Sequence, residues 1–479
     1  MARHAEGSAK ILQNSFFMMA SMVMTAGLGF LFWGLVARLY STERVGLATS
    51  LISAISLISY LGLLGFNNTV VRFQATGAAR NSQVTIALCV TGAACCAFGA
   101  AYLGVLPWIS PKLLFVREDT WFAVAFVLFC GFAGVNLLTD SVFVAARIPQ
   151  YNLLVDGVVQ SLTKLAMPIF LVTLGAAGIV TATGAGYAVA VFASLAAMRW
   201  RLGFRLDVRT RGTRLREQAR FSLASYLSAL LNLVPLLVLP TIALQDLGPN
   251  GAADYFMAFQ IANMLNTAGH SIASAMFTEV SHDPARMSES LRRAARLMVV
   301  VVVPASAAVI FGGGLLLAAF GPDYVRDARA VLSILAGGSI AVAFNTWSSY
   351  AVQLAGRLRP LVASNAVFAV VTIGLAAYWG PRGLVWLGWA WVAGNLLSGI
   401  VAVVYVPRTA ASALSVADAA ADALPPAPRR EIPFDDAATV TLVLPWIVPA
   451  GGRARSSMAV RPRSSPARDQ SSAGHERGW

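Results

Sequence analysis

Apolar blocks of about 20 residues follow one another along most of this chain, and short polar links separate them. Each block is long enough to cross a bilayer as an α-helix. Backbone groups inside a bilayer must be hydrogen-bonded within the protein, so such a chain folds as a bundle of membrane-spanning helices. Only 12% of the residues are charged, against about 25% in a soluble domain. These features exclude a soluble enzyme with a single anchor.

The pattern predicts an all-α polytopic membrane protein with about 12 transmembrane helices. The predicted spans are residues 14–37, 45–66, 84–106, 121–146, 153–174, 179–198, 217–243, 252–276, 296–319, 327–353, 361–379 and 383–406. They divide the chain into an N-lobe (1–200, spans 1–6), a basic cytoplasmic linker (201–216), a C-lobe (217–406, spans 7–12) and a tail (407–479). The tail is rich in Ala, Pro, Arg and Ser, which predicts a disordered segment.

The net charge of +14 is concentrated in alternate links. The stretch "MRWRLGFRLDVRTRGTRLRE", residues 198–217, carries most of the positive charge between the two halves. Loops rich in Arg and Lys stay on the cytoplasmic side of a membrane. The charge pattern therefore predicts that both termini are cytoplasmic.

The two halves share a weak internal repeat. The stretch "NLLTDSVFVAARIPQYNLLVDGVV" from Asn136 aligns with "NTWSSYAVQLAGRLRPLVASNAVF" from Asn345 at an offset of 209 residues. Residues 45–57 match residues 252–264 more weakly, at an offset of 207. Six spans per half give both halves the same orientation, so we predict two six-helix lobes related by a parallel pseudo-repeat.

The fifth predicted span carries unusual charge. In "LLVDGVVQSLTKLAMPIFLV", Asp156, Gln160 and Lys164 are spaced by four residues, which places them on one side of a helix. A charge at the bilayer centre costs roughly 2.5–3.5 kcal/mol, so charges there usually have a function. The repeat aligns Asp156 with Asn365 and Lys164 with Ile373. The second half builds the same helix without charges, and the fold therefore does not require them.

Several stretches within residues 10–406 resemble the polysaccharide flippases of the multidrug/oligosaccharidyl-lipid/polysaccharide (MOP) exporter superfamily. They are "NSFFMMASMVMTAGLGFLFWGLVARLYSTERVGLATSL", "LGLLGFNNTVVRF", "FSLASYLSALLNLVPLLVLPTIA", "AADYFMAFQIANML" and "FGPDYVRDARAVLSILA". The resemblance implies an exporter that moves a polyprenyl-pyrophosphate-linked oligosaccharide across the bacterial inner membrane by alternating access, for cell-surface polysaccharide synthesis. The first span carries no acidic residue of the kind that cation-coupled drug exporters of this superfamily use, which disfavours drug export.

The resemblance gives the charged residues of spans four and five a candidate role. Lys164 and Arg147 would attract the anionic headgroup, while Asp140 or Asp156 would balance them when the cavity is empty, or carry a proton. Gln160 would line the same wall. The alternative is an internal ion pair, or side chains that reach the membrane interface from helix ends.

Other polar residues are candidates for the same cavity. Asn67, Asn68 and Arg72 end the second span and would contact the headgroup at the cytoplasmic mouth, or else cap a helix and fix topology. Span eight presents one polar face to the cavity or to neighbouring helices, and its histidine is a candidate proton site. This face consists of Gln260, Asn263, Thr267 and His270. Asn345, the counterpart of Asn136, completes the set.

The sequence thus predicts a transporter that is not an enzyme and uses no cofactor or metal; it carries no nucleotide-binding or metalloprotease motif. Its partners would be the lipid-linked oligosaccharide and membrane lipids, with a polysaccharide polymerase and glycosyltransferases as candidates, and no nucleic acid. Two alternatives stay open: a cation-coupled multidrug exporter of the same superfamily, and a non-transporting membrane component of polysaccharide assembly, such as a glycosyltransferase.

Overall fold

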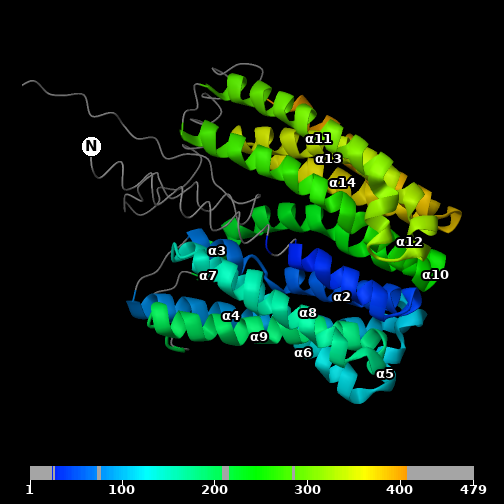
Figure 1. The fold of residues 1–479 in the computed structure, drawn as a ribbon. Coiled ribbons are helices and arrows are strands. Elements are labelled where there is room, and N and C mark those ends of the chain that lie inside the picture. Colours follow the sequence, from blue (N-terminus) through cyan, green and yellow to red (C-terminus); the bar gives the residue numbers. More distant parts are fainter. Residues whose placement is uncertain (1–23, 25–26, 73–76, 208–214, 283–285, 407–479) are drawn as a thin grey trace, which may run out of the picture.

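The computed structural model describes residues 24, 27–72, 77–207, 215–282 and 286–406. Within these residues the regular secondary structure is helical (Figure 1). The predicted tail, the centre of the predicted linker and the start of the first span lie outside them. The side chain of Arg72 also lies outside the described part.

The first half runs from the first span to the end of α9. Its elements are the helix Gly27–Leu39, α2 (Thr42–Gly62), α3 (Phe66–Arg72), α4 (Gly77–Ile109), η1 (Pro111–Leu113), α5 (Phe115–Glu118), α6 (Thr120–Ala145), α7 (Gln150–Asn152), the π-helix η2 (Leu153–Gln160), α8 (Ser161–Phe170), η3 (Val172–Leu174) and α9 (Ala176–Arg201). Together α7, η2 and α8 form the fifth span.

The second half begins with α10, a long helix bent at Gly248, where the backbone leaves helical geometry. Its elements are α10 (Leu215–His282), α11 (Met287–Ala318), α12 (Pro322–Asp327), α13 (Arg329–Leu354), α14 (Leu358–Trp379), η5 (Gly380–Arg382) and α15 (Leu384–Val404). Ten helices of the described residues are long and apolar enough to cross a membrane. Because α10 supplies spans seven and eight and the shorter helix Gly27–Leu39 belongs to the first span, the described residues contain twelve apolar helical segments. The predicted fold class is confirmed.

The internal repeat is visible in the backbone. Helix α13 begins and ends 209 residues after α6, at the offset predicted from Asn136 and Asn345. The turns after these helices repeat the same hydrogen bonds: Arg147 N donates to Val144 O, and Gly356 N donates to Gln353 O. Arg147 has a φ of 59°, and Gly356, its counterpart, has a φ of 70°.

The two lobes meet along α2 and α10, and they pack most closely beside the bend at Gly248 (Figure 1). There Gly46 of α2 lies against the Pro249 carbonyl, where a larger side chain would clash. Arg38 Nε donates to Ala319 O at 3.1 Å, and Lys112 Nζ donates to Leu244 O at 2.9 Å. Basic side chains of the N-lobe thus cap carbonyl groups of the C-lobe.

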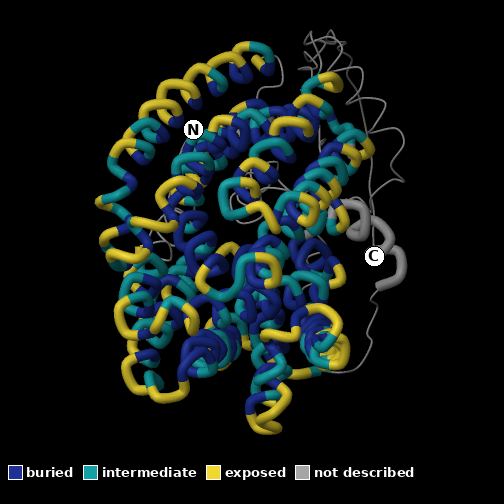
Figure 2. Tube along the Cα trace, turned by 90° about the vertical axis from the view of Figure 1, so that its right-hand side faces the viewer, coloured by how far each residue is buried: buried dark blue, intermediate teal, exposed yellow. Residues whose placement is uncertain are grey.

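Buried residues gather inside each lobe and where the lobes meet, and exposed residues follow the outward sides of the helices (Figure 2). Many exposed residues are large and apolar, including Phe170, Phe192 and Phe311. Such a surface suits contact with lipid chains rather than water. The structure therefore describes a multi-pass membrane protein.

Candidate functional site

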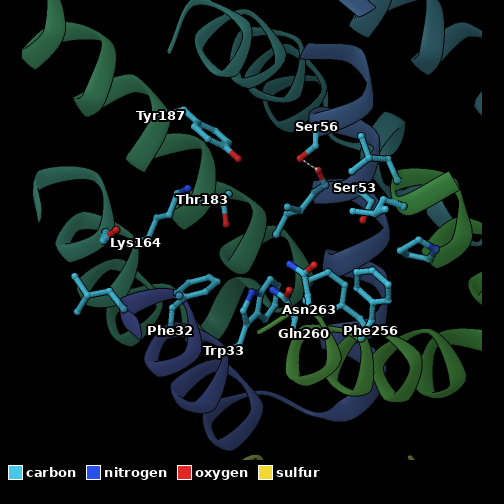
Figure 3. Close-up of a pocket in the computed structure, with 18 of the residues that line it drawn as sticks. Phe32, Trp33, Ser53, Ser56, Lys164, Thr183, Tyr187, Phe256, Gln260 and Asn263 are labelled. Atoms are coloured by element: carbon cyan, nitrogen blue, oxygen red, sulfur yellow. Dashed lines mark hydrogen bonds between the residues drawn. The ribbon is translucent and has the colours of Figure 1, made fainter. Parts of the chain in front are cut away.

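A cavity of about 280 Å³ lies between the two lobes (Figure 3). The N-lobe contributes the first, second, fifth and sixth spans to its lining, and the C-lobe contributes both arms of α10. Its polar lining residues are Ser53, Ser56, Gln160, Ser161, Lys164, Thr183, Tyr187, Tyr255, Gln260 and Asn263. The remaining lining is apolar or aromatic. A cavity bounded by both lobes changes shape whenever the lobes move relative to each other.

Lys164 is the charged member of the described lining. Its Nζ atom lies 4.1 Å from the centre of the Tyr187 ring and donates to Gln160 Oε1 at 3.2 Å. Both partners are neutral, so they orient the ammonium without cancelling its charge. A cation held over an aromatic ring away from water gains about 2 kcal/mol.

A glycine in α9, Gly186, leaves space for the Lys164 side chain. A Cβ atom at Gly186 would lie 2.6 Å from Lys164 Cγ and 3.0 Å from Lys164 Cε. The glycine therefore leaves the space that the lysine stem fills. At the repeat offset of 209, the second half has Asn395 in place of Gly186 and Ile373 in place of Lys164.

The fifth span reaches the cavity through a local change of helix type. Residues 153–160 form a π-helix, and Ser161 Oγ donates to Asp156 O at 2.8 Å, five residues earlier. The α-helix resumes at Ser161 and ends at Phe170, where the Tyr40 hydroxyl donates to Pro168 O at 2.8 Å. π-Helical turns are rare and often occur at functional sites.

Asp156 and Asp140 form a separate polar cluster between α6 and the fifth span. Asn136 Nδ2 donates to Asp156 Oδ1 at 3.1 Å, and the Asp140 carboxyl group lies close to that of Asp156. Neither carboxyl group is among the described lining of the cavity. Over the described residues, Asp156 and Lys164 form no ion pair. The three polar residues predicted to form one stripe on this span are therefore separated. Asp156 contacts α6, whereas Gln160 and Lys164 line the cavity.

The opposite side of the cavity is aromatic and amide-rich. Trp33 of the first span packs edge-on against Phe256 of α10, with ring centroids 4.6 Å apart. Gln260 and Asn263 follow Phe256 along α10 and face the same cavity (Figure 3). Aromatic faces pack well against apolar ring faces, while amides both donate and accept hydrogen bonds.

The other predicted site residues lie elsewhere. Asn67 and Asn68 are buried in α3, and Arg147 is exposed in the turn after α6. His270 lies about two turns beyond Asn263 and is not among the described cavity lining. Asn345 is buried inside the C-lobe, where its Nδ2 donates to Asn395 Oδ1 at 3.1 Å. Among the predicted residues, the structure brings four to one cavity: Gln160, Lys164, Gln260 and Asn263.

Sequence reasoning missed Tyr187, the aromatic partner of Lys164. Tyr187 stands in "TGAGYAV", whose glycines mark places where neighbouring side chains approach closely. The glycines predict that a neighbouring side chain approaches closely, but they do not identify that side chain as Lys164. Ser53 and Ser56, three residues apart on α2, also share a helix face that could have been noted.

Comparison with known proteins supports both the fold and the family. Residues 35–324 match a family described as polysaccharide biosynthesis protein. An inward-facing multidrug resistance transporter of the multidrug and toxin extrusion (MATE) family in the MOP superfamily matches with a TM-score of 0.61 and 17% identity. The match covers 86% of this chain and 96% of that one. No curated protein matches the chain.

Two further solved structures have the same fold. The outward-facing form of a MATE family multidrug resistance transporter gives a TM-score of 0.60 at 18% identity, over 86% of this chain and 96% of that one. A MOP superfamily transporter from Pyrococcus furiosus, described as having a binding pocket of reverse polarity, gives 0.58 at 18% identity, over 87% of this chain and 97% of that one. At such identities the matches establish the two-lobe fold, which the sequence predicted.

Proposed function

The chain belongs to the polysaccharide biosynthesis protein family, and from this premise we propose that it is a flippase for a lipid-linked oligosaccharide. The substrate would be a polyprenyl-pyrophosphate-linked sugar chain, moved across the bacterial inner membrane for cell-surface polysaccharide synthesis. The headgroup would cross through the cavity between the lobes while the polyprenyl chain stays in lipid. This activity requires no covalent chemistry by the protein.

The observation that carries the proposal is the charge of the cavity. Lys164 presents an ammonium group there, and the described lining contains no carboxylate to neutralise it. A positive charge in a low-dielectric cavity attracts an anion much more strongly than it would in water. A pyrophosphate diester is the anionic part of the proposed substrate, and its charge is the most costly feature of the substrate to place in lipid.

The remaining lining suits a sugar. Gln160, Gln260 and Asn263 supply donors and acceptors for hydroxyl groups, and Trp33 with Phe256 offers an aromatic surface for the apolar face of a sugar ring. Binding sites for small ligands commonly combine such an apolar wall with a few polar groups. A cavity of about 280 Å³ accommodates the part of the headgroup nearest the pyrophosphate.

Alternating access would complete the cycle. The lobes would separate at Gly46 and Pro249 on one side while closing on the other, which exposes the cavity to each side in turn. We propose, from the distribution of basic residues, that both termini are cytoplasmic and that the bend at Gly248 lies on the outer side. A polysaccharide polymerase and glycosyltransferases would be neighbours in the same pathway.

Reconstitution tests the proposal directly. Liposomes would carry a fluorescent polyprenyl-pyrophosphate disaccharide only in the inner leaflet, and an added membrane-impermeant lectin would report outward movement. We expect lectin binding to grow with time in liposomes that contain the protein, whichever way a given molecule is inserted. Empty liposomes and liposomes with an unrelated helical membrane protein are the controls. No movement beyond these controls would overturn the proposal.

Drug export is the second candidate, because the cavity is aromatic and the fold is shared with multidrug transporters. Lys164 makes the two candidates separable, since it repels cations. A drug exporter should move a cationic dye such as ethidium out of the liposomes, and removal of the positive charge at Lys164 should improve that movement. The flippase proposal expects no ethidium transport by the wild-type protein.

A further inference from the structure

A second, larger hollow lies on the C-lobe, away from the cavity. It is a groove of about 760 Å³ with α13 as its floor and α11 and α15 as its walls. All the described lining residues are apolar or glycine, and several are open to the outside, with Val299 60% exposed and Ile400 45% exposed. The groove and the cavity share no described lining residue.

The floor of the groove is held to one wall and is unobstructed. Trp347 of α13 donates its Nε1 hydrogen to Leu291 O of α11 at 3.0 Å, which ties the floor to the α11 wall. Gly337 lies on the floor, and a Cβ atom there would meet nothing closer than Ile310 Cδ1 at 4.0 Å. The floor therefore leaves room for an added side chain, or for a ligand.

Two arginines extend the α11 wall beyond the apolar part. Arg292 and Arg296 precede Val299 and Val303 by seven residues, which is nearly two helical turns, so all four lie on one face of α11. Both arginines are exposed. The apolar groove is thus continuous along α11 with a positively charged surface at the end of the helix that the charge pattern places in the cytoplasm.

We propose that this groove binds an anionic phospholipid of the cytoplasmic leaflet. One acyl chain would lie along Met298, Val302 and Phe344, and the phosphate would contact Arg292 and Arg296. Basic residues at the cytoplasmic end of transmembrane helices bind anionic headgroups, and the cytoplasmic leaflet is enriched in anionic lipid. A phospholipid fits better than the transported lipid, because the groove is built by the C-lobe alone and lacks any wall in common with the cavity.

Native mass spectrometry of the full chain tests this site. The protein would be purified in mild detergent and incubated with phosphatidylglycerol or with phosphatidylcholine, and the bound lipid would be counted. We expect one phosphatidylglycerol to be retained in preference to phosphatidylcholine. The double variant Arg292→Gln/Arg296→Gln should weaken this retention about thirtyfold, since each basic residue near a membrane surface contributes about fivefold.

A groove-filling variant separates the apolar site from the charge. Gly337→Leu should also abolish retention of that lipid, because a Cβ atom there meets nothing closer than 4.0 Å and the added side chain would occupy the groove. Gly374→Leu is the matched control: Gly374 is exposed on α14, has nothing within 4 Å, and should leave retention unchanged. If Gly337→Leu fails to fold, the exposed arginine pair still decides the question.

Three results would overturn the proposal. The first is equal retention of the two lipids by the wild-type protein. The second is retention of phosphatidylglycerol by the double arginine variant at the wild-type level. The third is displacement of phosphatidylglycerol by equimolar polyprenyl phosphate, which would assign the groove to the carrier of the transported sugar.

Discussion

The hairpin of spans four and five and its repeat in spans ten and eleven share the first helix and the turn after it, but one holds charged polar groups and the other neutral ones. Helices α6 and α13 have equal lengths, and the turns that follow them share their hydrogen bonds. The first half places carboxyl groups and an ammonium on this scaffold. The second half uses neutral pairs: Asn345 with Asn395, and Asn365 with Ser228 at 2.9 Å.

This difference between the two halves indicates which polar groups the fold requires. Neutral amides and hydroxyls pair with one another inside the C-lobe, so the repeated hairpin is built there without charge. Burying a charge is expensive unless something compensates it. The N-lobe retains Lys164 at the cavity although Ile373 occupies the equivalent position, and Gly186 leaves space for it. We infer that the charge serves the cavity rather than the scaffold.

The largest expected effect comes from removing that charge. Lys164→Met keeps the length of the side chain and should lower translocation of the lipid-linked sugar about a hundredfold, since a charged hydrogen bond contributes up to about 3 kcal/mol. Ile373→Met is the matched control and should transport normally. Translocation would be measured by the lectin assay at equal protein per liposome. Equal losses of translocation in Lys164→Met and Ile373→Met would contradict the inferred difference between the two halves.

Filling the space beside the lysine should have the next largest effect. Gly186→Ala forces the Lys164 stem away from Tyr187, and loss of a cation–π contact of about 2 kcal/mol should slow translocation about thirtyfold. Gly104→Ala, in α4 with nothing within 4 Å, should leave the rate unchanged. The same lectin assay reports both. A Gly186→Ala protein as fast as wild type would mean that the position of Lys164 is not critical.

The neutral pair of the C-lobe should matter for stability alone. Asn395→Leu leaves the buried Asn345 amide without its partner, which should cost about 1–3 kcal/mol of unfolding free energy. The double variant Asn345→Leu/Asn395→Leu should recover most of this, because replacing both partners is nearly neutral. Chemical unfolding in detergent micelles gives both values. A translocation defect in the well-folded double variant would assign these amides to transport instead.

The smallest effect concerns the two turns. Arg147 adopts a left-handed conformation that costs a non-glycine residue about 1–2 kcal/mol, and its counterpart is Gly356. Arg147→Gly should therefore raise stability by up to about 1 kcal/mol, after the added chain entropy of glycine is subtracted. Gly356→Arg should lower it by a similar amount. Thermal unfolding of the two purified variants checks this, and shifts of the same sign would contradict it.

Much of the architecture follows from periodicity, and much of the site does not. Apolar length set the positions of the spans, and the alignment of Asn136 with Asn345 gave the offset that relates α6 to α13. The four-residue spacing of Gln160 and Lys164 correctly grouped them on one wall. Helical spacing says which residues share a face, but it does not say which helix lies opposite that face. Tyr187, Trp33 and Phe256 could therefore not be assigned to the cavity in advance.

The position of the Asp156 carboxyl group shows a second reason why the sequence did not predict the whole site. Asp156 was expected to share a stripe with Lys164, but it lies in a π-helix and bonds to Asn136, whereas Lys164 lies in the α-helix that follows. A change of helix type alters which residues align along a helix, and no residue pattern in the sequence predicts that change. Asn345 was predicted to line the cavity, yet it pairs with Asn395 inside the C-lobe.

Binding of the anionic headgroup itself tests the central claim most directly. A short-chain prenyl-pyrophosphate sugar would be titrated into the detergent-purified protein, with the same sugar on a prenyl chain without phosphate as the comparison ligand. The account predicts that Lys164→Met weakens binding of the pyrophosphate ligand about a hundredfold and leaves the uncharged ligand unaffected. Equal affinity of wild-type and Lys164→Met protein for the pyrophosphate ligand would contradict it.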